Sequence, residues 1–394
     1  TDIDGDNVAD VFIAGRNADN TLVSKLYLNE AGTYLEQANT PFVGVEFGTV
    51  DVVDLNGDSL LDILLTGQGE NAPLAALYLN QGAGEFVAAA GMPFSAVSQS
   101  ATTIADLNGD QLPDILITGS SQSGLPSTHL YLNQGAGTFE EETNHPFEDV
   151  ELGAIASFDF NDDTFPDIVL SGSNGQAEPI TKLYLNDGLG NFIEIPAGSM
   201  EQVEASSIAY ADINDDAFPD LLIAGKTAQE NASVVTHLYL SDGQGNFTLS
   251  EDASFLGVQK GDIAFLDFNM DDLPDIFMVG QNNSNDPTAR LYLNTGPIID
   301  DDNDGFPVEE DCDDSNPNIN PDALEIPYNG LDDDCDPLTL DDDLDEDGYG
   351  LSEDCDDNNP NINPDVLEVP YNGLDDDCDP LTLDDDLDED GFGL

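Results

Sequence analysis

Aspartate recurs at alternate positions of a nine-residue segment that occurs six times before residue 276. Oxygens at positions 1, 3, 5 and 9 of such a tight turn, with the carbonyl at position 7, can converge on one hard cation. Carboxylate and amide ligands favour calcium, because magnesium keeps more water and zinc or copper prefers nitrogen or sulfur. The segments are DIDGDNVAD, DLNGDSLLD, DLNGDQLPD, DFNDDTFPD, DINDDAFPD and DFNMDDLPD.

These six loops therefore predict six calcium sites with the same arrangement of ligands. The predicted ligands are Asp2, Asp4, Asp6, Val8, Asp10; Asp54, Asn56, Asp58, Leu60, Asp62; Asp106, Asn108, Asp110, Leu112, Asp114; Asp159, Asn161, Asp163, Phe165, Asp167; Asp212, Asn214, Asp216, Phe218, Asp220; and Asp267, Asn269, Asp271, Leu273, Asp275. Position 4 is Gly in the first three loops but Asp162, Asp215 and Met270 in the others. If that position needs a positive φ, Met270 is strained and the sixth site is the weakest.

The loops begin 52 to 55 residues apart, and each belongs to a repeat that reads as short β-strands. Each loop is followed by an apolar run ending in Gly, then by LYLN or LYLS, and usually by a G-x-G-x-F turn. Repeats of this kind cannot bury their own faces, so copies must pack side by side. We expect an all-β fold, a β-propeller of six or seven blades. The first copy lacks the preceding apolar strand, so ring closure needs sequence upstream of Thr1 or a strand from elsewhere.

The charge of the chain restricts its partners. It has 83 acidic and 6 basic side chains, a formal charge of -77, and the last 98 residues contain 37 acids and no base. Nucleic acid and anionic membranes would be repelled, whereas cations would be attracted. No apolar run is long enough for a membrane helix, so we expect no membrane span in this segment.

After residue 296 the period changes to 43 residues, which marks a second region at 297–394 beside the first at 1–296. Each copy begins with a twelve-residue loop of EF-hand spacing, although flanking helices are not evident and position 12 is Asp instead of Glu. A second acidic cluster, NGLDDDCD, is a candidate for another site. The predicted ligands are Asp300, Asp302, Asp304, Phe306 and Asp311 in one loop, and Asp343, Asp345, Asp347, Tyr349 and Asp354 in the next.

The four cysteines lie in this acidic tail, where they are better read as disulfides than as metal ligands. Three pairings are possible, and the repeat favours Cys312 with Cys335 and Cys355 with Cys378, one bridge per copy. Zinc is the alternative, although no His is nearby and there is no C-x-x-C pair. Disulfides imply an oxidising compartment.

Both regions resemble known repeat families. The aspartate loop, apolar strand, LYLN and G-x-G-x-F turn are similar to the FG-GAP/VCBS repeats of bacterial surface proteins, which are related to the integrin α-subunit propeller. This resemblance implies a calcium-bearing propeller, usually of seven blades, used in adhesion or carried on secreted enzymes. The tail resembles the MopE-type metal-binding repeat and, more loosely, thrombospondin type 3 repeats. The family name implies copper, but the tail has no His and the chain no Trp.

No catalytic motif stands out from the calcium aspartates, and His129 and His237 occupy a variable strand position. We therefore expect no enzyme, but an extracellular structural or adhesive protein of a bacterial cell surface, with calcium as its cofactor and self-association into a fibre. The alternative is a carbohydrate-binding, lectin-like module that uses the variable loops to contact a cell-surface ligand. An accessory domain of a secreted enzyme is a third possibility.

Overall fold

The computed structural model describes residues 1–228, 233–250, 253–296, 302, 306, 311–313, 315–336, 339 and 341–382. The chain forms two compact units, Thr1–Asn294 and Thr295–Leu394, each of which is considered by itself. The described residues contain strands, turns and bends and no helix. Accordingly, no helix among them is long and apolar enough to cross a membrane.

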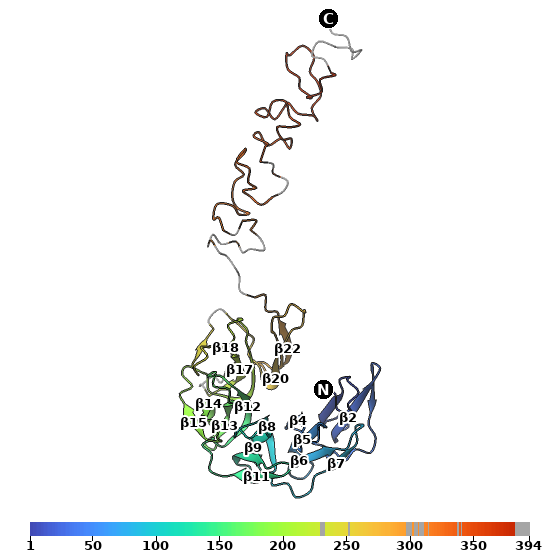
Figure 1. Cartoon of the computed structure of the whole chain (residues 1–394), viewed down its shortest axis with the longest axis vertical. Coiled ribbons are helices and arrows are strands. Elements are labelled where there is room, and N and C mark those ends of the chain that lie inside the picture. Colours follow the sequence, from blue (N-terminus) through green and yellow to red (C-terminus); the bar gives the residue numbers. More distant parts are fainter. Residues whose placement is uncertain are drawn as a thin grey trace. The chain divides into compact units, whose positions relative to one another are not determined.

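The first unit is a series of antiparallel sheets in which strands adjacent in sequence pair (Figure 1). The first sheet contains β1 (Val11–Arg16), β2 (Leu22–Glu30) and β3 (Thr33–Glu36). The next two groups are β4 (Val50–Val53), β5 (Asp62–Gln68), β6 (Pro73–Asn80) and β7 (Phe86–Ala88), then β8 (Val97–Ala105), β9 (Asp114–Ser121), β10 (Pro126–Asn133) and β11 (Phe139–Glu142). These two groups are joined at one residue pair, Leu74 with Val97.

The later repeats follow the same plan. The fourth group of strands contains β12 (Val150–Phe158), β13 (Asp167–Asn174), β14 (Pro179–Asn186) and β15 (Phe192–Ile195). The fifth contains β16 (Val203–Ala211), β17 (Asp220–Thr227), β18 (Val234–Ser241) and β19 (Phe247–Leu249). The sixth contains β20 (Gln259–Leu266), β21 (Asp275–Gln281) and β22 (Pro287–Tyr292).

The sheets are arranged as the blades of a β-propeller, which confirms the predicted fold. The first strands of four successive blades, β8, β12, β16 and β20, lie next to one another. They line a central cavity of about 450 Å³. Figure 1 shows the blades following one another around this centre in chain order. The first group of strands begins with β1, the counterpart of β5 and β9.

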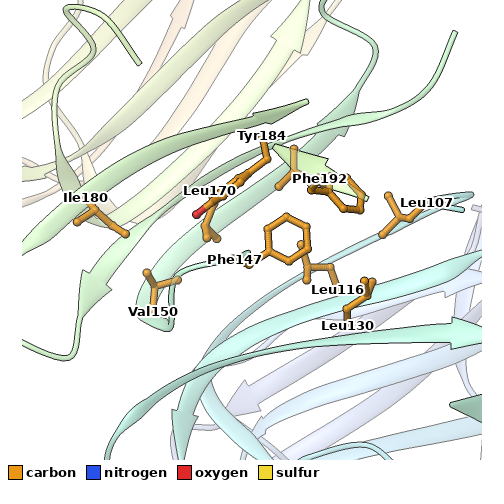
Figure 2. Close-up of a cluster of buried hydrophobic side chains, with 10 residues drawn as sticks. Leu107, Leu116, Leu130, Phe147, Val150, Leu170, Ile180, Tyr184 and Phe192 are labelled. Atoms are coloured by element: carbon orange, nitrogen blue, oxygen red, sulfur yellow. The ribbon is translucent and has the colours of Figure 1, made fainter. Parts of the chain in front are cut away.

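The hydrophobic core lies between blades. The middle strands are largely buried. The strand β13, with the sequence DIVLSGSN, is buried along its whole length, because both of its faces contact neighbouring blades. Between the third and fourth blades, the ring of Phe147 contacts Tyr184 and Phe192 at centroid distances of 4.9 and 4.8 Å. Leu107, Leu116 and Leu130 complete this cluster from the third blade (Figure 2).

The tyrosine of the LYLN or LYLS run makes a hydrogen bond in addition to its packing contacts. In five repeats its hydroxyl accepts a backbone N–H from the segment that leads into the first strand of its own blade. The recorded donors are Val43 to Tyr78, Ser95 to Tyr131, Glu148 to Tyr184, Glu201 to Tyr239 and Leu256 to Tyr292. Burial raises the pKa of Tyr184 to about 12, so the hydroxyl is neutral at physiological pH.

The second unit is held by covalent links instead of a sheet. Disulfides join Cys312 to Cys335 and Cys355 to Cys378, with Cα atoms 5.6 and 5.5 Å apart. This confirms the pairing that the repeat favoured. All four cysteines of the chain are consumed, so no thiolate is left for the zinc alternative. Since disulfides persist in oxidising compartments, the tail suits an extracellular environment.

We expect Tyr184→Phe to lower the free energy of unfolding by about 1–2 kcal/mol, because the Glu148 amide loses its acceptor while the ring packing is kept. Tyr210→Phe is the matched control: Tyr210 is 45% exposed, and its substitution should change stability by less than about 0.5 kcal/mol. Urea denaturation of both variants tests this. Equal stability of the two would contradict the role assigned to the hydroxyl.

Candidate metal centres

The first aspartate of each loop organises the turn. In the second loop, Asp54 Oδ1 accepts the amides of Gly57 and Asp58 at 2.7 and 3.2 Å, and Oδ2 accepts that of Ser59 at 2.7 Å. The other loops place the same carboxylate on the amides of positions 5 and 6. The carboxylate thus draws the backbone around itself, which sets the direction of the side chains that follow.

Positions 3 and 5 are brought together by the same local bonds. In the second loop, Asn56 Oδ1 accepts the Asp58 amide at 2.9 Å, and Asp58 Oδ1 accepts the Leu60 amide at 2.9 Å. Asn56 Nδ2 also donates to Asp58 Oδ2 at 3.0 Å. In the first loop, where position 3 is Asp4, carboxylate oxygens of Asp2, Asp4 and Asp6 lie within 4.8 Å of one another. Like charges this close repel one another, so the group could hold a cation.

Position 9 differs from the other ligand positions because it is buried. Asp114, at the start of β9, has no exposed surface; its Oδ2 accepts the Leu107 amide at 3.0 Å and its Oδ1 accepts the Asn133 amide at 2.8 Å. Burial outweighs these two bonds and raises the pKa of Asp114 to about 6. The equivalent Asp167 and Asp220 are raised to about 7 and about 6 for the same reason.

An asparagine outside the loops ties consecutive loops together. Asn133, the last residue of β10, donates Nδ2 to the carbonyl of Pro113 in its own loop at 3.1 Å and to that of Leu55 in the preceding loop at 3.0 Å. Asn80 and Asn186 make the same pair of bonds. In the fifth repeat, LYLS replaces LYLN and this asparagine is absent. There the backbone amide of Gly245 donates a hydrogen bond to the Phe160 carbonyl of the preceding loop at 3.1 Å.

Sequence reasoning did not assign this role to the asparagine, although the repeated LYLN was a signal for it. The bonded loop residue is 77 to 79 positions away, so local spacing does not reveal the contact. Because the first five loops are each held both by their own blade and by the next one, a cation in such a loop would stabilise the interface between two blades.

Backbone strain distinguishes the last three loops from the first three. Position 4 has a positive φ in every loop, from 60° at Asp215 to 86° at Gly5, and Met270 has 64°. The expected strain at Met270 is thus present in the structure. The side chain of Met270 is 88% exposed, and position 2 of the same loop, Phe268, is 61% exposed, whereas Leu107 is buried at the equivalent place. The sixth loop lacks both the glycine and the buried anchor.

The second tail loop repeats the hydrogen bonds of the propeller loops. Asp343 Oδ1 and Oδ2 accept the amides of Asp347 and Gly348 at 3.2 and 2.8 Å, and Asp347 Oδ1 accepts that of Tyr349 at 3.0 Å. Carboxylate oxygens of Asp343, Asp345 and Asp347 lie within 4.8 Å of one another. Burial and the nearby carboxylates of Asp347 and Asp354 raise the pKa of Asp345.

Several oxygens of this loop have no donor. Among the described residues, both carboxylate oxygens of Asp345 and Oδ2 of Asp354 are buried and accept no hydrogen bond. The equivalent Asp311 has the same unpartnered Oδ2. Orphaned, oxygen-only groups of this kind fit a hard cation. In the first tail loop, Asp302 and Phe306 are described, whereas Asp300 and Asp304 lie outside the described residues.

A third acidic group lies in the first disulfide-closed module. Carboxylate oxygens of Glu325, Asp332 and Asp334 are within 4.8 Å of one another. The Asn329–Asp336 segment that sequence reasoning singled out contributes the two aspartates, and Glu325 was not anticipated. Glu325 Oε2 accepts the Asp333 amide at 2.8 Å, and Glu368 Oε2 accepts that of Asp376 at 2.9 Å in the next copy.

Comparison with known families agrees with the repeats and the loops. The FG-GAP-like repeat model matches residues 2–65, 54–117, 106–170 and 159–223, which is more than half of the chain. The chain belongs to the FG-GAP-like repeat family. The metal-binding motif of the Cu-binding MopE model matches residues 311–339 and 354–382 in the tail. No curated protein matches the chain.

Solved structures with a similar fold include lectins and glycoside hydrolases. AofleA from Arthrobotrys oligospora is 11% identical, with 71% of this FG-GAP-like chain and 77% of that chain covered and a TM-score of 0.42. The six-bladed lectin of Aleuria aurantia is 9% identical, with 73% and 87% covered and a TM-score of 0.40. A thermostable family-43 glycoside hydrolase is 10% identical, with 64% and 90% covered and a TM-score of 0.35. At these values the likeness carries no information on ligands.

We expect Met270→Gly to stabilise the protein by about 0.5–1 kcal/mol, because glycine adopts the positive φ without strain and little packing is lost. Gly57→Met should destabilise it by a similar amount, since a Cβ at Gly57 would meet no atom within 4 Å and only the backbone is affected. Thermal unfolding of both variants measures this. A destabilised Met270→Gly variant would contradict the strain argument.

Proposed function

We propose that this FG-GAP-like repeat protein is an extracellular, calcium-loaded structural or adhesive protein of a bacterial surface, which self-associates and does not catalyse a reaction. The observation that carries the proposal is the gathering of carboxylates in loops that also connect neighbouring blades through Asn80, Asn133 and Asn186. A cation at such a place acts as structural support, because its binding free energy is added to the interface.

Electrostatics supports the binding of calcium ions in the loops. Each predicted ligand set contains three or four carboxylates, in a chain whose formal charge is -77. The described ion pairs, such as Lys182 Nζ with Glu194 at 2.7 Å, are on strand surfaces and not in the loops. Cations from solution are therefore the remaining source of compensation. Oxygen ligands favour calcium over the copper that the tail family's name suggests.

The tail supports an extracellular and mechanical role. Each copy has one disulfide between cysteines that are 23 residues apart, and an acidic loop lies between successive disulfides. Such links restrict the unfolded chain, typically by about 3 kcal/mol for a loop of this size, in modules too small for a full core. Cation binding in the intervening loop would stiffen the joint between modules.

We expect calcium to raise the unfolding free energy by about 2.7 kcal/mol per bound ion when its concentration is one hundred times the dissociation constant. Asp110→Asn should reduce this calcium-dependent gain, yet be no less stable in EGTA, because it also removes like-charge repulsion. Asp19→Asn, an exposed aspartate outside the loops, is the matched control. Denaturation with calcium, magnesium or EGTA tests this; equal stability in all three would contradict the calcium proposal.

We expect native protein in calcium to form elongated assemblies visible by negative-stain electron microscopy, and to dissociate or soften in EGTA. A glycan array separates this from the carbohydrate-binding alternative. A monodisperse monomer that binds one class of glycan with calcium present would contradict the structural proposal and favour the lectin-like function. Assemblies without glycan binding would support it.

A further inference from the structure

Asp357 is a buried carboxylate that lies outside every predicted loop. It follows Asp354, the last predicted ligand of the second tail loop, by three residues, within the module closed by Cys355 and Cys378. The side chain is 4% exposed, and its Oδ1 accepts the Leu344 amide at 3.3 Å. Because Leu344 lies between Asp343 and Asp345, this bond places Asp357 against the ligands of the loop.

The second oxygen of Asp357 has no partner. Its Oδ2 is buried and accepts no hydrogen bond from the described residues. A basic side chain cannot compensate it, because the sequence contains no Lys, Arg or His after Arg290. A buried, unpaired carboxylate is costly, so it either stays protonated or binds a cation. Asp354, three residues earlier, is 6% exposed and also has an unpartnered Oδ2, so this short segment contains two buried oxygens without a hydrogen-bond donor.

The loop itself is short of ligands. Calcium takes six to eight oxygens, and an EF-hand obtains two of them from a bidentate Glu at position 12. Here position 12 is Asp354, whose Oδ1 is already engaged by the Asp356 amide at 2.8 Å. We propose that Asp357 is a further ligand of the cation bound by residues 343–354, in place of the missing glutamate oxygen. This inference rests on the cation binding proposed above.

The consequence is a cation that joins two parts of the tail. Residues 343–354 link the first disulfide-closed module to the second, whereas Asp357 belongs to the second module. Other bonds already hold this part of the tail to both modules: Asn329 donates its amide to Asp341, two residues before the loop, at 2.8 Å, and Asn363 Nδ2 donates to Asp347 in the loop at 2.7 Å. With Asp357 as a ligand, cation binding fixes the loop onto the following module.

Terbium luminescence can report on this one site in the whole, oxidised chain. The chain has no Trp, and Tyr349 occupies position 7 of the loop, where the other predicted loops have Val, Leu or Phe. The tyrosine-sensitised emission that Tyr349→Phe removes therefore belongs to this site. The luminescence lifetimes in H₂O and D₂O also count the water molecules on the bound ion.

We expect Asp357→Asn to weaken the Tyr349-dependent terbium binding by about tenfold or more and to add about one water molecule to the bound ion. The side-chain oxygen of the asparagine can still accept the Leu344 N–H, but the charged ligand is lost. Asp356→Asn, an exposed neighbour with the same charge change, should leave affinity within about twofold of wild type and hydration unchanged.

Two results would overturn the inference while leaving the tail site intact: equal behaviour of the Asp357 and Asp356 variants, or weaker binding by Asp357→Asn without added water, which would make Asp357 a positioning residue. If wild type shows no Tyr349-dependent signal, the proposed tail site and this inference both fail.

Discussion

Mutual repulsion between carboxylates is the constraint on which this structure depends. Both halves of the chain gather aspartate oxygens within 4.8 Å of one another, at Asp2, Asp4 and Asp6 and again at Asp343, Asp345 and Asp347. Backbone amides stabilise these groups in part, because the first aspartate of each loop accepts amides from the turn that it starts. Amides carry no net charge, however, so the remaining negative field attracts cations.

The two halves use this constraint differently. In the propeller, the loops lie beside buried apolar interfaces such as the one around Phe147, and Asn133 connects one loop to the next. A cation there adds to a core that already exists. In the tail, the described residues contain no sheet or helix, and the disulfides and acidic loops take over the role of a core. We therefore expect the tail to depend more strongly on cations than the propeller.

Features encoded by local spacing could be predicted from the sequence. The six loops, the four-stranded repeat and the disulfide pairing all follow from residues that recur at fixed intervals. The strain at Met270 could also be anticipated, because position 4 of the turn requires a positive φ. What the sequence does not reveal are contacts across repeats: the bond from Asn186 to the Leu107 carbonyl spans 79 positions. Likewise, Asp357 stands in a run of acids, and only its burial distinguishes it from Asp356.

The central claim is that calcium occupies the aspartate loops and supports the scaffold. The most direct measurement is the number of ions per chain, by equilibrium dialysis at fixed free calcium in excess magnesium, followed by elemental analysis. The account predicts six calcium ions from the propeller loops and at least one more from the tail. A chain that retains no calcium, or that retains copper or zinc in its place, would contradict it.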